Sequence, residues 1–138
     1  MTDEELRDLI GELRAAGTDH ADVEAKTAET ELPKRLWETV SAFANTLGGG
    51  VILLGIDERC AFQVVGISNA KKLQQDLASV CDQMEPPIRA QIRLHRFEGK
   101  AIVVAEIPET DRSQKPCYYR GAGQTNGRSC ASQTAIEG

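Results

Sequence analysis

The chain has few of the residue types that build recognisable chemical sites. Its 138 residues include two histidines, four cysteines and an aromatic fraction of 4%. The cysteines form no Cys-x-x-Cys pair, so we predict ordinary reduced thiols, mostly buried, rather than a zinc site or a disulfide framework. His20 and His95 stand apart from any recognisable nucleophile arrangement, which argues against a hydrolytic triad. The four cysteines are Cys60, Cys81, Cys117 and Cys130.

Long apolar runs and an excess of basic residues are also missing. Apolar runs such as residues 51–54 are far too short to span a bilayer, so we expect no association with a membrane. Residues 1–5 are acidic and lack the basic region and apolar core of a secretory signal, which predicts a cytoplasmic location. The net charge of −5 argues against a polycation that coats nucleic acid without specificity.

Glycines are present, but not in the order that binds a nucleotide. A phosphate-binding loop follows a strand and opens a helix, whereas Gly48, Gly49 and Gly50 close a predicted helix and open a strand. No Gly-Lys-Ser/Thr sequence occurs, which excludes a P-loop. Residues 121–127 also miss the dinucleotide spacing. That second glycine-rich segment is either a flexible hairpin tip or a mobile basic element lying along a phosphate backbone.

The hydrophobic patterns predict one α+β domain over residues 1–138. Thr2 or Asp3 can cap a first helix that ends at Gly17, with Glu5 completing a capping box. Pro33 suits the first turn of a second helix whose apolar stripe extends to Leu47 and which the glycines stop. A third helix begins after Ser68 or Asn69 and ends before residues 86–87, which are prolines.

Strand patterns occupy most of the remaining chain. Residues 23–28 alternate as in a half-exposed strand, and residues 51–56 have the character of a buried strand with residues 62–67 as its hairpin partner. Residues 88–95 and 101–107 form a second predicted hairpin. We therefore expect a mixed sheet of about five or six strands with about three helices. The chain ends without a closing element, so we expect it to be the N-terminal part of a longer protein.

Charge is distributed unevenly along the chain. Residues 1–31 hold ten acids and three bases, whereas residues 112–135 hold four bases and no acid. Arg89, Arg93 and His95 share one face of the predicted strand 88–95. Together with Arg96 they form either a solvated face or a surface that contacts phosphates. Asp19, Glu24 and Asp57 flank or end strands, so they are either structural acids or ligands that converge on a divalent cation for phosphodiester hydrolysis.

Residues 42–58 resemble a known family. They read Ala-Phe-Ala-Asn-Thr, then glycines, then an apolar strand ending Gly-Ile-Asp, and this resembles the Schlafen-type, Alba-like DNA-binding domain. Three further phrases in the same order support the resemblance, which extends over residues 18–128. They are Val23-Glu24-Ala25-Lys26, similar to the family's Glu-Phe-Lys strand, Glu85-Pro86-Pro87-Ile88, similar to its Pro-bearing strand entry, and Lys115-Pro116-Cys117-Tyr118-Tyr119, similar to its Pro-x-Tyr segment.

The resemblance implies an Alba-like/Schlafen core at the N-terminus of a bacterial transcriptional regulator. Our leading hypothesis is a domain that binds DNA or RNA through the phosphate backbone and needs no cofactor. A module for homodimerisation, with function in downstream domains, is an alternative from another class. The residues expected to contact phosphates are Lys26, Lys34, Arg35, Arg89, Arg93, Arg120 and Arg128.

A second alternative is a ribonuclease that depends on Mg²⁺ or Mn²⁺. Related domains in animal Schlafen proteins include RNA endonucleases with three carboxylates, whose positions resemble Asp19, Glu24 and Asp57 in this chain. Two departures weaken the transfer, because Asp19 is shorter than the usual glutamate and Ala25 replaces the usual phenylalanine. Residues 128–130 likewise depart from the family's Tyr-x-Arg phrase.

Overall fold

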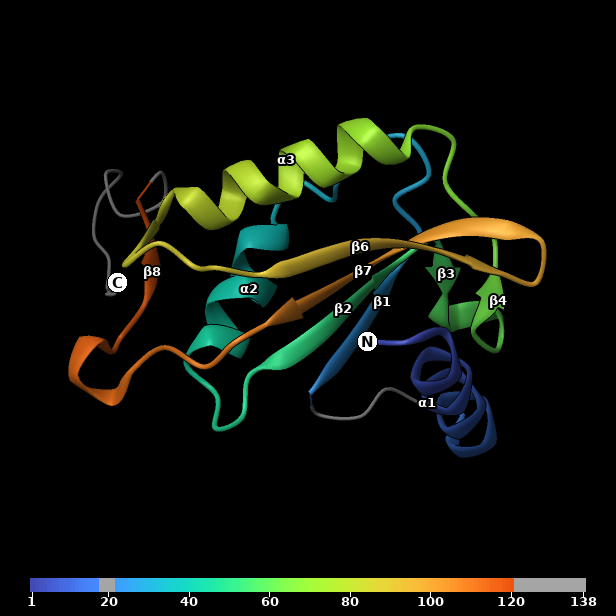
Figure 1. Cartoon of the computed structure of the whole chain (residues 1–138), viewed down its shortest axis with the longest axis horizontal. Helices are drawn as coiled ribbons and strands as arrows, with labels where there is room; N and C mark the ends of the chain where they lie inside the picture. The colour runs from blue at the N-terminus through green and yellow to red at the C-terminus, as the bar shows by residue number, and fades with distance from the viewer. Residues whose placement is uncertain (18–21, 121–138) are drawn as a thin grey trace.

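The computed structural model describes residues 1–17 and 22–120, which form a mixed sheet with helices on both faces (Figure 1). The four strands of this sheet lie in the order β1-β2-β7-β6. The first two strands are parallel and the others antiparallel, so the α+β class is confirmed. The strands are β1 (Val23–Lys26), β2 (Gly50–Leu54), β6 (Gln91–Phe97) and β7 (Lys100–Ile107).

The mixed sheet has four of the five or six predicted strands, and two smaller sheets of two strands each lie beside it. One pairs β3 (Ile56–Asp57) with β4 (Gln63–Val64), and the other pairs β5 (Met84–Glu85) with β8 (Tyr118–Tyr119). Two short 3-10 turns, η1 (Glu58–Cys60) and η2 (Arg112–Gln114), lie in the connections.

Helix α1 (Asp3–Ala16) forms as its terminal residues predict. Thr2 Oγ1 accepts a hydrogen bond from the Glu5 amide at 3.1 Å, and the Glu5 carboxylate accepts one from the Thr2 amide at 2.8 Å. Gly17 ends the helix at φ 76°, where glycine pays no steric cost for the left-handed backbone. The buried side of α1 packs on one face of the sheet with β3 and β4.

Helix α2 (Leu36–Ala44) is shorter than the sequence predicts. It begins three residues after Pro33 and ends at Ala44, before the glycines. The next residues form a tight turn closed by the Gly49 amide on the Thr46 carbonyl at 2.9 Å. Gly50 then lies so close to α2 that a Cβ atom there would overlap the Phe43 ring. The prediction that Leu47 belongs to the apolar stripe is wrong, because this side chain is 88% exposed.

The hairpin predicted between residues 51–56 and 62–67 forms only at its closed end, where Ile56 pairs with Val64. Residues 62–67 do not pair with β2, which lies between β1 and β7, and β4 pairs instead with β3. The reason is Gly55, whose φ of 105° breaks the strand so that the chain leaves the sheet after Leu54. The Gly55 amide donates to the Lys26 carbonyl at 2.8 Å, and its own carbonyl accepts from the Val65 and Gly66 amides.

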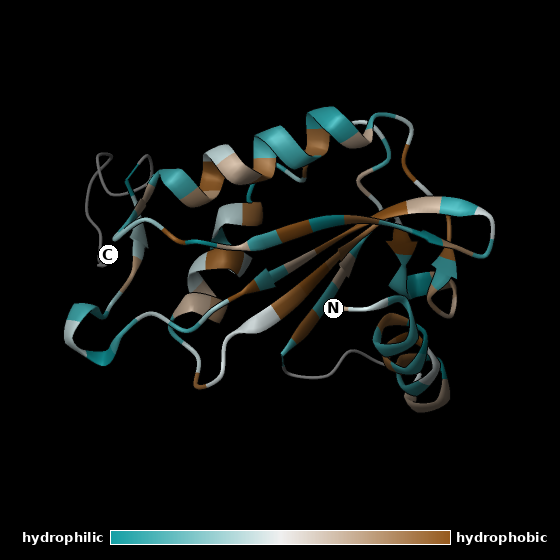
Figure 2. Cartoon of the chain, in the orientation of Figure 1, coloured by the Kyte–Doolittle hydropathy of each residue, from teal (hydrophilic) through white to brown (hydrophobic). Residues whose placement is uncertain are grey.

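Helix α3 (Ala70–Asp82) lies with α2 on the face of the sheet opposite α1. Asn69 caps it, with Oδ1 accepting from the Lys72 amide at 3.2 Å. Leu73, Leu77 and Cys81 are buried, whereas Met84, expected on the helix, belongs to β5. Figure 2 shows the hydrophobic residues concentrated on α2 and the central strands, with hydrophilic residues along the outer sides of α1 and α3.

The hairpin of β6 and β7 is confirmed. Glu98 (φ 52°) and Gly99 (φ 80°) form its two-residue turn, and Phe97 pairs with Lys100. Arg14 of α1 holds this turn by two hydrogen bonds of 2.8 and 2.9 Å to the Glu98 carboxylate. This ion pair raises the pKa of Arg14 and lowers that of Glu98.

The described cysteines are free thiols, as predicted. Cys81 and Cys117 are buried, whereas Cys60 is exposed, and Cys130 lies outside the described residues. Burial, the largest cause, raises the pKa of the Cys81 thiol to about 11. Within residues 1–17 and 22–120, no helix combines the length and apolar character needed to cross a membrane.

Candidate nucleic-acid interface

The three carboxylates proposed as metal ligands are not assembled by the described part of the chain. Asp19 lies outside the described residues. Glu24 Oε2 lies 3.1 Å from Lys26 Nζ on the same strand. Asp57, with a side chain 15% exposed, caps η1 by accepting from the Arg59 amide at 3.0 Å. Among the residues that the structure describes, no three His, Cys, Asp or Glu side chains are grouped to hold a metal ion.

The strand arrangement nevertheless keeps Glu24 and Asp57 on adjacent elements. β1 and β2 run parallel, and Glu24 pairs with Ile52 in the middle of the strand. Asp57 follows the end of β2, next to the end of β1. Each carboxylate already interacts with a protein group, so the described residues do not fit a metal site by themselves and we derive no catalytic step from them.

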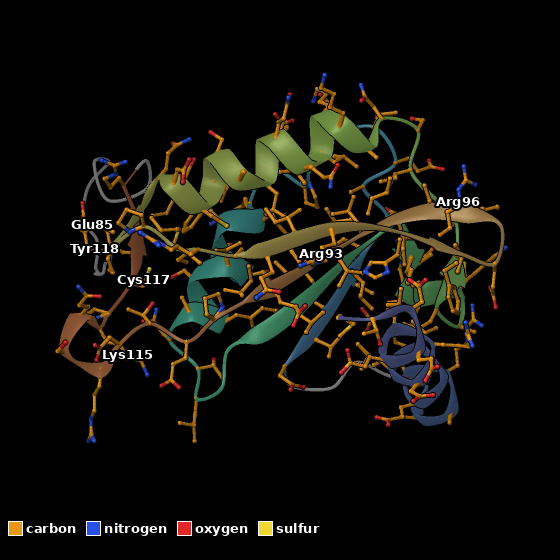
Figure 3. All side chains as sticks on the ribbon, viewed as in Figure 1. Glu85, Arg93, Arg96, Lys115, Cys117 and Tyr118 are labelled. Carbon is orange, nitrogen blue, oxygen red and sulfur yellow. The ribbon has the colours of Figure 1, made fainter. Side chains whose placement is uncertain are left out.

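Three arginines line the β6 edge of the sheet. Arg89 precedes β6, while Arg93 and Arg96 lie on it (Figure 3). All three are exposed, and within residues 1–17 and 22–120 none forms a salt bridge or a side-chain hydrogen bond. We call these three residues the arginine strand. The sequence placed Arg96 beside the basic face of Arg89 and Arg93, but Arg96 was not among the residues expected to contact phosphates.

Register places Arg93 and Lys26 on different sides of the sheet. Arg93 pairs with Val104, whose side chain packs in the α1 cluster. Lys26 pairs with Leu54, which packs with α2 and α3, and its strand forms the opposite edge. Since three strand intervals separate the two edges, they lie about 14 Å apart.

The remaining predicted bases are scattered. Lys34 and Arg35 lie before α2, where Arg35 Nη2 pairs with Glu38 Oε2 at 2.7 Å. Arg120 donates to the carbonyls of Asp82 and Gln83 at the C-terminal end of α3, at 3.2 and 3.3 Å. Arg128 lies outside the described residues, as does the glycine-rich segment 121–127. Of the predicted phosphate contacts that the structure describes, Arg89 and Arg93 therefore lie at one edge of the sheet, whereas the others lie at separate places.

His95 does not belong to the exposed basic face that the sequence predicts. The side chain faces α1 and is 8% exposed, with Nδ1 2.7 Å from Asp3 Oδ1. Nε2 is buried without a partner among the described residues. The alternation along β6 could not reveal this contact, because Asp3 lies 92 residues away in the sequence.

Beside the arginine strand lies an open cleft that sequence reasoning missed. Its volume is about 270 Å³, and it lies where β2, β6 and β7 meet the turn after α2. Arg89 and Gln91 contribute to one side, and the acids Asp22 and Glu106 are also part of the lining. Glu106 is paired with the Met1 ammonium at 2.6 Å. No sequence motif signals this cleft, because its lining residues come from four separate segments.

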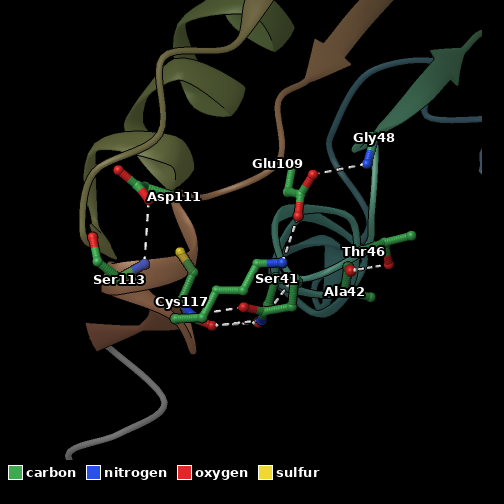
Figure 4. A network of polar contacts seen from close by, with 10 residues as sticks. Ser41, Ala42, Thr46, Gly48, Glu109, Asp111, Ser113 and Cys117 are labelled. Carbon is green, nitrogen blue, oxygen red and sulfur yellow. Dashed lines mark hydrogen bonds and ion pairs between the residues drawn. The ribbon is translucent and has the colours of Figure 1, made fainter.

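The turn after α2 is held by a polar network (Figure 4). The Gly48 amide donates to Glu109 Oε1 at 3.0 Å, and Lys115 Nζ lies 2.6 Å from Glu109 Oε2. Thr46 Oγ1 donates to the Ala42 carbonyl at 2.6 Å. The hydrogen bond from Gly48, followed by the Lys115 contact, lowers the pKa of Glu109.

These features define a small α+β domain with a basic edge strand. The chain belongs to the Schlafen, AlbA_2 family, whose model matches residues 19–129. The fold is similar to the solution structure of the N-terminal domain of a "Putative ATP-dependent DNA Helicase RecG-related Protein" from Nitrosomonas europaea. That likeness has 36% identity and a TM-score of 0.69, and covers 88% of this chain and 84% of that one.

A second solved structure shows the fold alone. It is the DIP2311 protein from Corynebacterium diphtheriae, with 17% identity and a TM-score of 0.55. The likeness covers 86% of this chain and 24% of that chain, so this domain corresponds to about a quarter of the larger protein. A comparison with curated proteins gave no significant match.

Proposed function

We propose that this chain is the DNA-binding domain of a transcriptional regulator and that it contacts the phosphate backbone through the arginine strand. Family membership and the RecG-related relative support a role with nucleic acid. The observation that carries the proposal is the set of three exposed arginines without ion-pair partners among the described residues. Unpaired guanidinium groups are available to hold phosphates by paired hydrogen bonds.

The spacing of the arginine strand suits a phosphate backbone. At about 3.3 Å per residue, Arg93 lies about 10 Å along the strand from Arg96 and at most about 13 Å from Arg89, which precedes the strand. Phosphates of one DNA strand advance about 3.4 Å along the helix axis per nucleotide, so the three arginines are far enough apart to contact separate phosphates. Arg93 and Arg96 leave β6 toward opposite faces, which makes the edge of the sheet the contact surface.

The other predicted bases contribute at longer range in this proposal. They attract the DNA through the field of the domain and do not share one contact surface with the arginine strand. The acids of α1 oppose this attraction, which is why we expect local contacts rather than total charge to determine affinity. The residues assigned this weaker role are Lys26, Lys34, Arg35, Arg120 and Arg128.

The test is the salt dependence of binding. Three neutralised phosphates on duplex DNA predict that the logarithm of the association constant falls with the logarithm of salt concentration with a slope of about −2.7. Arg93→Ala and Arg96→Ala should each reduce the slope by about 0.9. Lys71→Ala is the matched control, because Lys71 is an exposed base on α3 that does not belong to the arginine strand, and it should leave the slope unchanged. Fluorescence anisotropy with duplex DNA measures all four proteins.

Parallel arms separate the alternatives. Structured RNA replaces DNA in one arm, and Mn²⁺ is added in another to detect cleavage. If the wild type cleaves RNA in Mn²⁺ and Asp57→Asn does not, the ribonuclease alternative would replace the DNA-binding proposal. The absence of salt-dependent binding to either nucleic acid would refute the proposal. Sedimentation velocity in the same buffers tests the predicted homodimer, for which the edge strands β1 and β6 are the available pairing surfaces.

A further inference from the structure

The turn after α2 presents an apolar side chain to solvent on a rigid support. Leu47 is 88% exposed, the highest value among the large hydrophobic residues of the described chain. Both neighbours are fixed, Thr46 by the Ala42 carbonyl and Gly48 by the Glu109 carboxylate. In Figure 1 this turn projects beyond the end of the sheet. Turns of this kind normally carry polar residues, so a leucine held at the tip of this one is available to an apolar partner.

The open cleft begins immediately beside this turn. Gly48, the residue after Leu47, is part of its lining, together with Gly50 and Val51. Arg89, the first member of the arginine strand, lies in the same lining. The volume of about 270 Å³ is below the range of about 300–1,000 Å³ typical for drug-sized ligands, so the cleft suits a single planar ring system.

We propose that the cleft receives one nucleobase extruded from the bound DNA, while Leu47 enters the space that the base leaves in the stack. This inference rests on the proposed function, because the arginine strand must first place the DNA against the edge of the sheet. Arg89 would hold a phosphate next to the extruded base. Leucine is among the apolar side chains that proteins insert between base steps.

The polar lining favours a base with an exocyclic amino group. The carboxylate of Asp22 accepts hydrogen bonds only, and it has no side-chain partner among the described residues. The Gln91 amide can donate as well as accept. Glu106 is offset by the Met1 ammonium, which reduces its repulsion of the nearby phosphates. Adenine, cytosine and guanine carry the amino donor, whereas thymine does not.

The test compares two DNA duplexes that differ in the cost of extruding a base. One is fully paired, and the other carries 2-aminopurine, which has an exocyclic amino group, in a mismatch. Extrusion costs less at a mismatch, so the protein should bind that duplex about tenfold more tightly. Loss of base stacking should also raise the fluorescence of 2-aminopurine.

Two variants and one control assign these effects to the site. Leu47→Ser should abolish the preference for the mismatch and the rise in fluorescence, with the salt slope unchanged, and Gln91→Ala should reduce both signals. Leu94→Ser is the control, since Leu94 is 49% exposed and faces the opposite side of β6 from Gln91. Thermal unfolding checks that all variants are folded.

Each result decides between the two proposals. Salt-dependent binding with a mismatch preference that Leu47→Ser removes supports the inference. Salt-dependent binding without that preference, or with equal signals in wild type and Leu47→Ser, refutes the inference and leaves the proposed function standing. No salt-dependent binding to either duplex refutes both.

Discussion

Asn45 joins two segments that lie far apart in the sequence, and its removal gives a sharp test of the fold. Its Nδ2 atom donates to the carbonyls of Ser41 and Cys117, each at 2.9 Å. Its Oδ1 atom accepts from the Cys117 amide at 2.8 Å. Both backbone groups of Cys117, a residue 1% exposed, are therefore satisfied by one side chain 72 residues away. This contact gives a physical reason for asparagine in the Ala-Phe-Ala-Asn-Thr phrase.

Asn45→Ala leaves the buried Cys117 amide without a partner. A buried backbone group that loses its hydrogen bond costs about 1–3 kcal/mol. The Cys117 carbonyl retains the Ser41 hydroxyl at 3.0 Å, so the penalty falls mainly on the amide. We expect the free energy of unfolding to decrease by about 2–3 kcal/mol, including the weakened second bond. With a urea dependence of about 1.5 kcal/mol per molar, the midpoint should fall by about 1.3–2 M.

Ser41→Ala is the matched comparison. It removes one donor to the same carbonyl, which keeps Asn45 Nδ2, so we expect a loss of about 0.5–1 kcal/mol. Urea unfolding followed by Trp37 fluorescence measures both variants, because Trp37 stacks on Tyr119 with ring centroids 5.3 Å apart near this network. A loss below about 0.5 kcal/mol for Asn45→Ala, or equal losses for the two variants, would refute the reasoning.

Three further predictions concern other parts of the molecule. In a Cys130→Ser background, a thiol reagent at mildly alkaline pH should label Cys60 before Cys81, because Cys60 is exposed whereas burial raises the pKa of Cys81 to about 11; the hydrogen bond with Asp57 also raises the pKa of Cys60 and slows its labelling. Labelling of Cys81 as fast as that of Cys60 in the folded protein would contradict the burial of Cys81. Because the pKa of Glu109 is lowered in the folded protein, its ionised carboxylate stabilises the fold at pH values above the ordinary pKa of glutamate. This stabilisation is lost as the pH falls through the folded-state pKa. The urea midpoints of wild type and Glu109→Gln should therefore differ at neutral pH and converge below about pH 4. Gly50→Ala should lower the free energy of unfolding by about 1–3 kcal/mol through overlap with the Phe43 ring, a loss that Phe43→Leu in the same chain should partly relieve.

Elements set by neighbouring residues could be predicted from the sequence. The cap of α1, its end at Gly17, the Asn69 cap and the turn at Glu98 and Gly99 each depend on contacts within about four residues. The α+β class followed from the same local patterns. The family could also be predicted, because the resemblance rested on short runs of consecutive residues that can be read without the tertiary structure.

The candidate surface required the tertiary structure. Arg93 and Lys26 read alike in the sequence, yet strand order and register place them at opposite edges of the sheet. Arg89 joins Gly48 at one cleft because β6 and β2 both flank β7. Leu47 follows the helical spacing of the apolar residues in α2, but it is exposed because the helix ends at Ala44.

The sequence by itself thus determined most of the helices and strands, the family and the separation of acidic from basic segments. The tertiary structure decided which charges share a surface, which strands form the edges of the sheet and which polar groups meet across the fold, as the contacts of His95 and Asn45 show. The physical reason is that strand order, register and burial are set by packing between residues far apart in the chain, so no local pattern contains them.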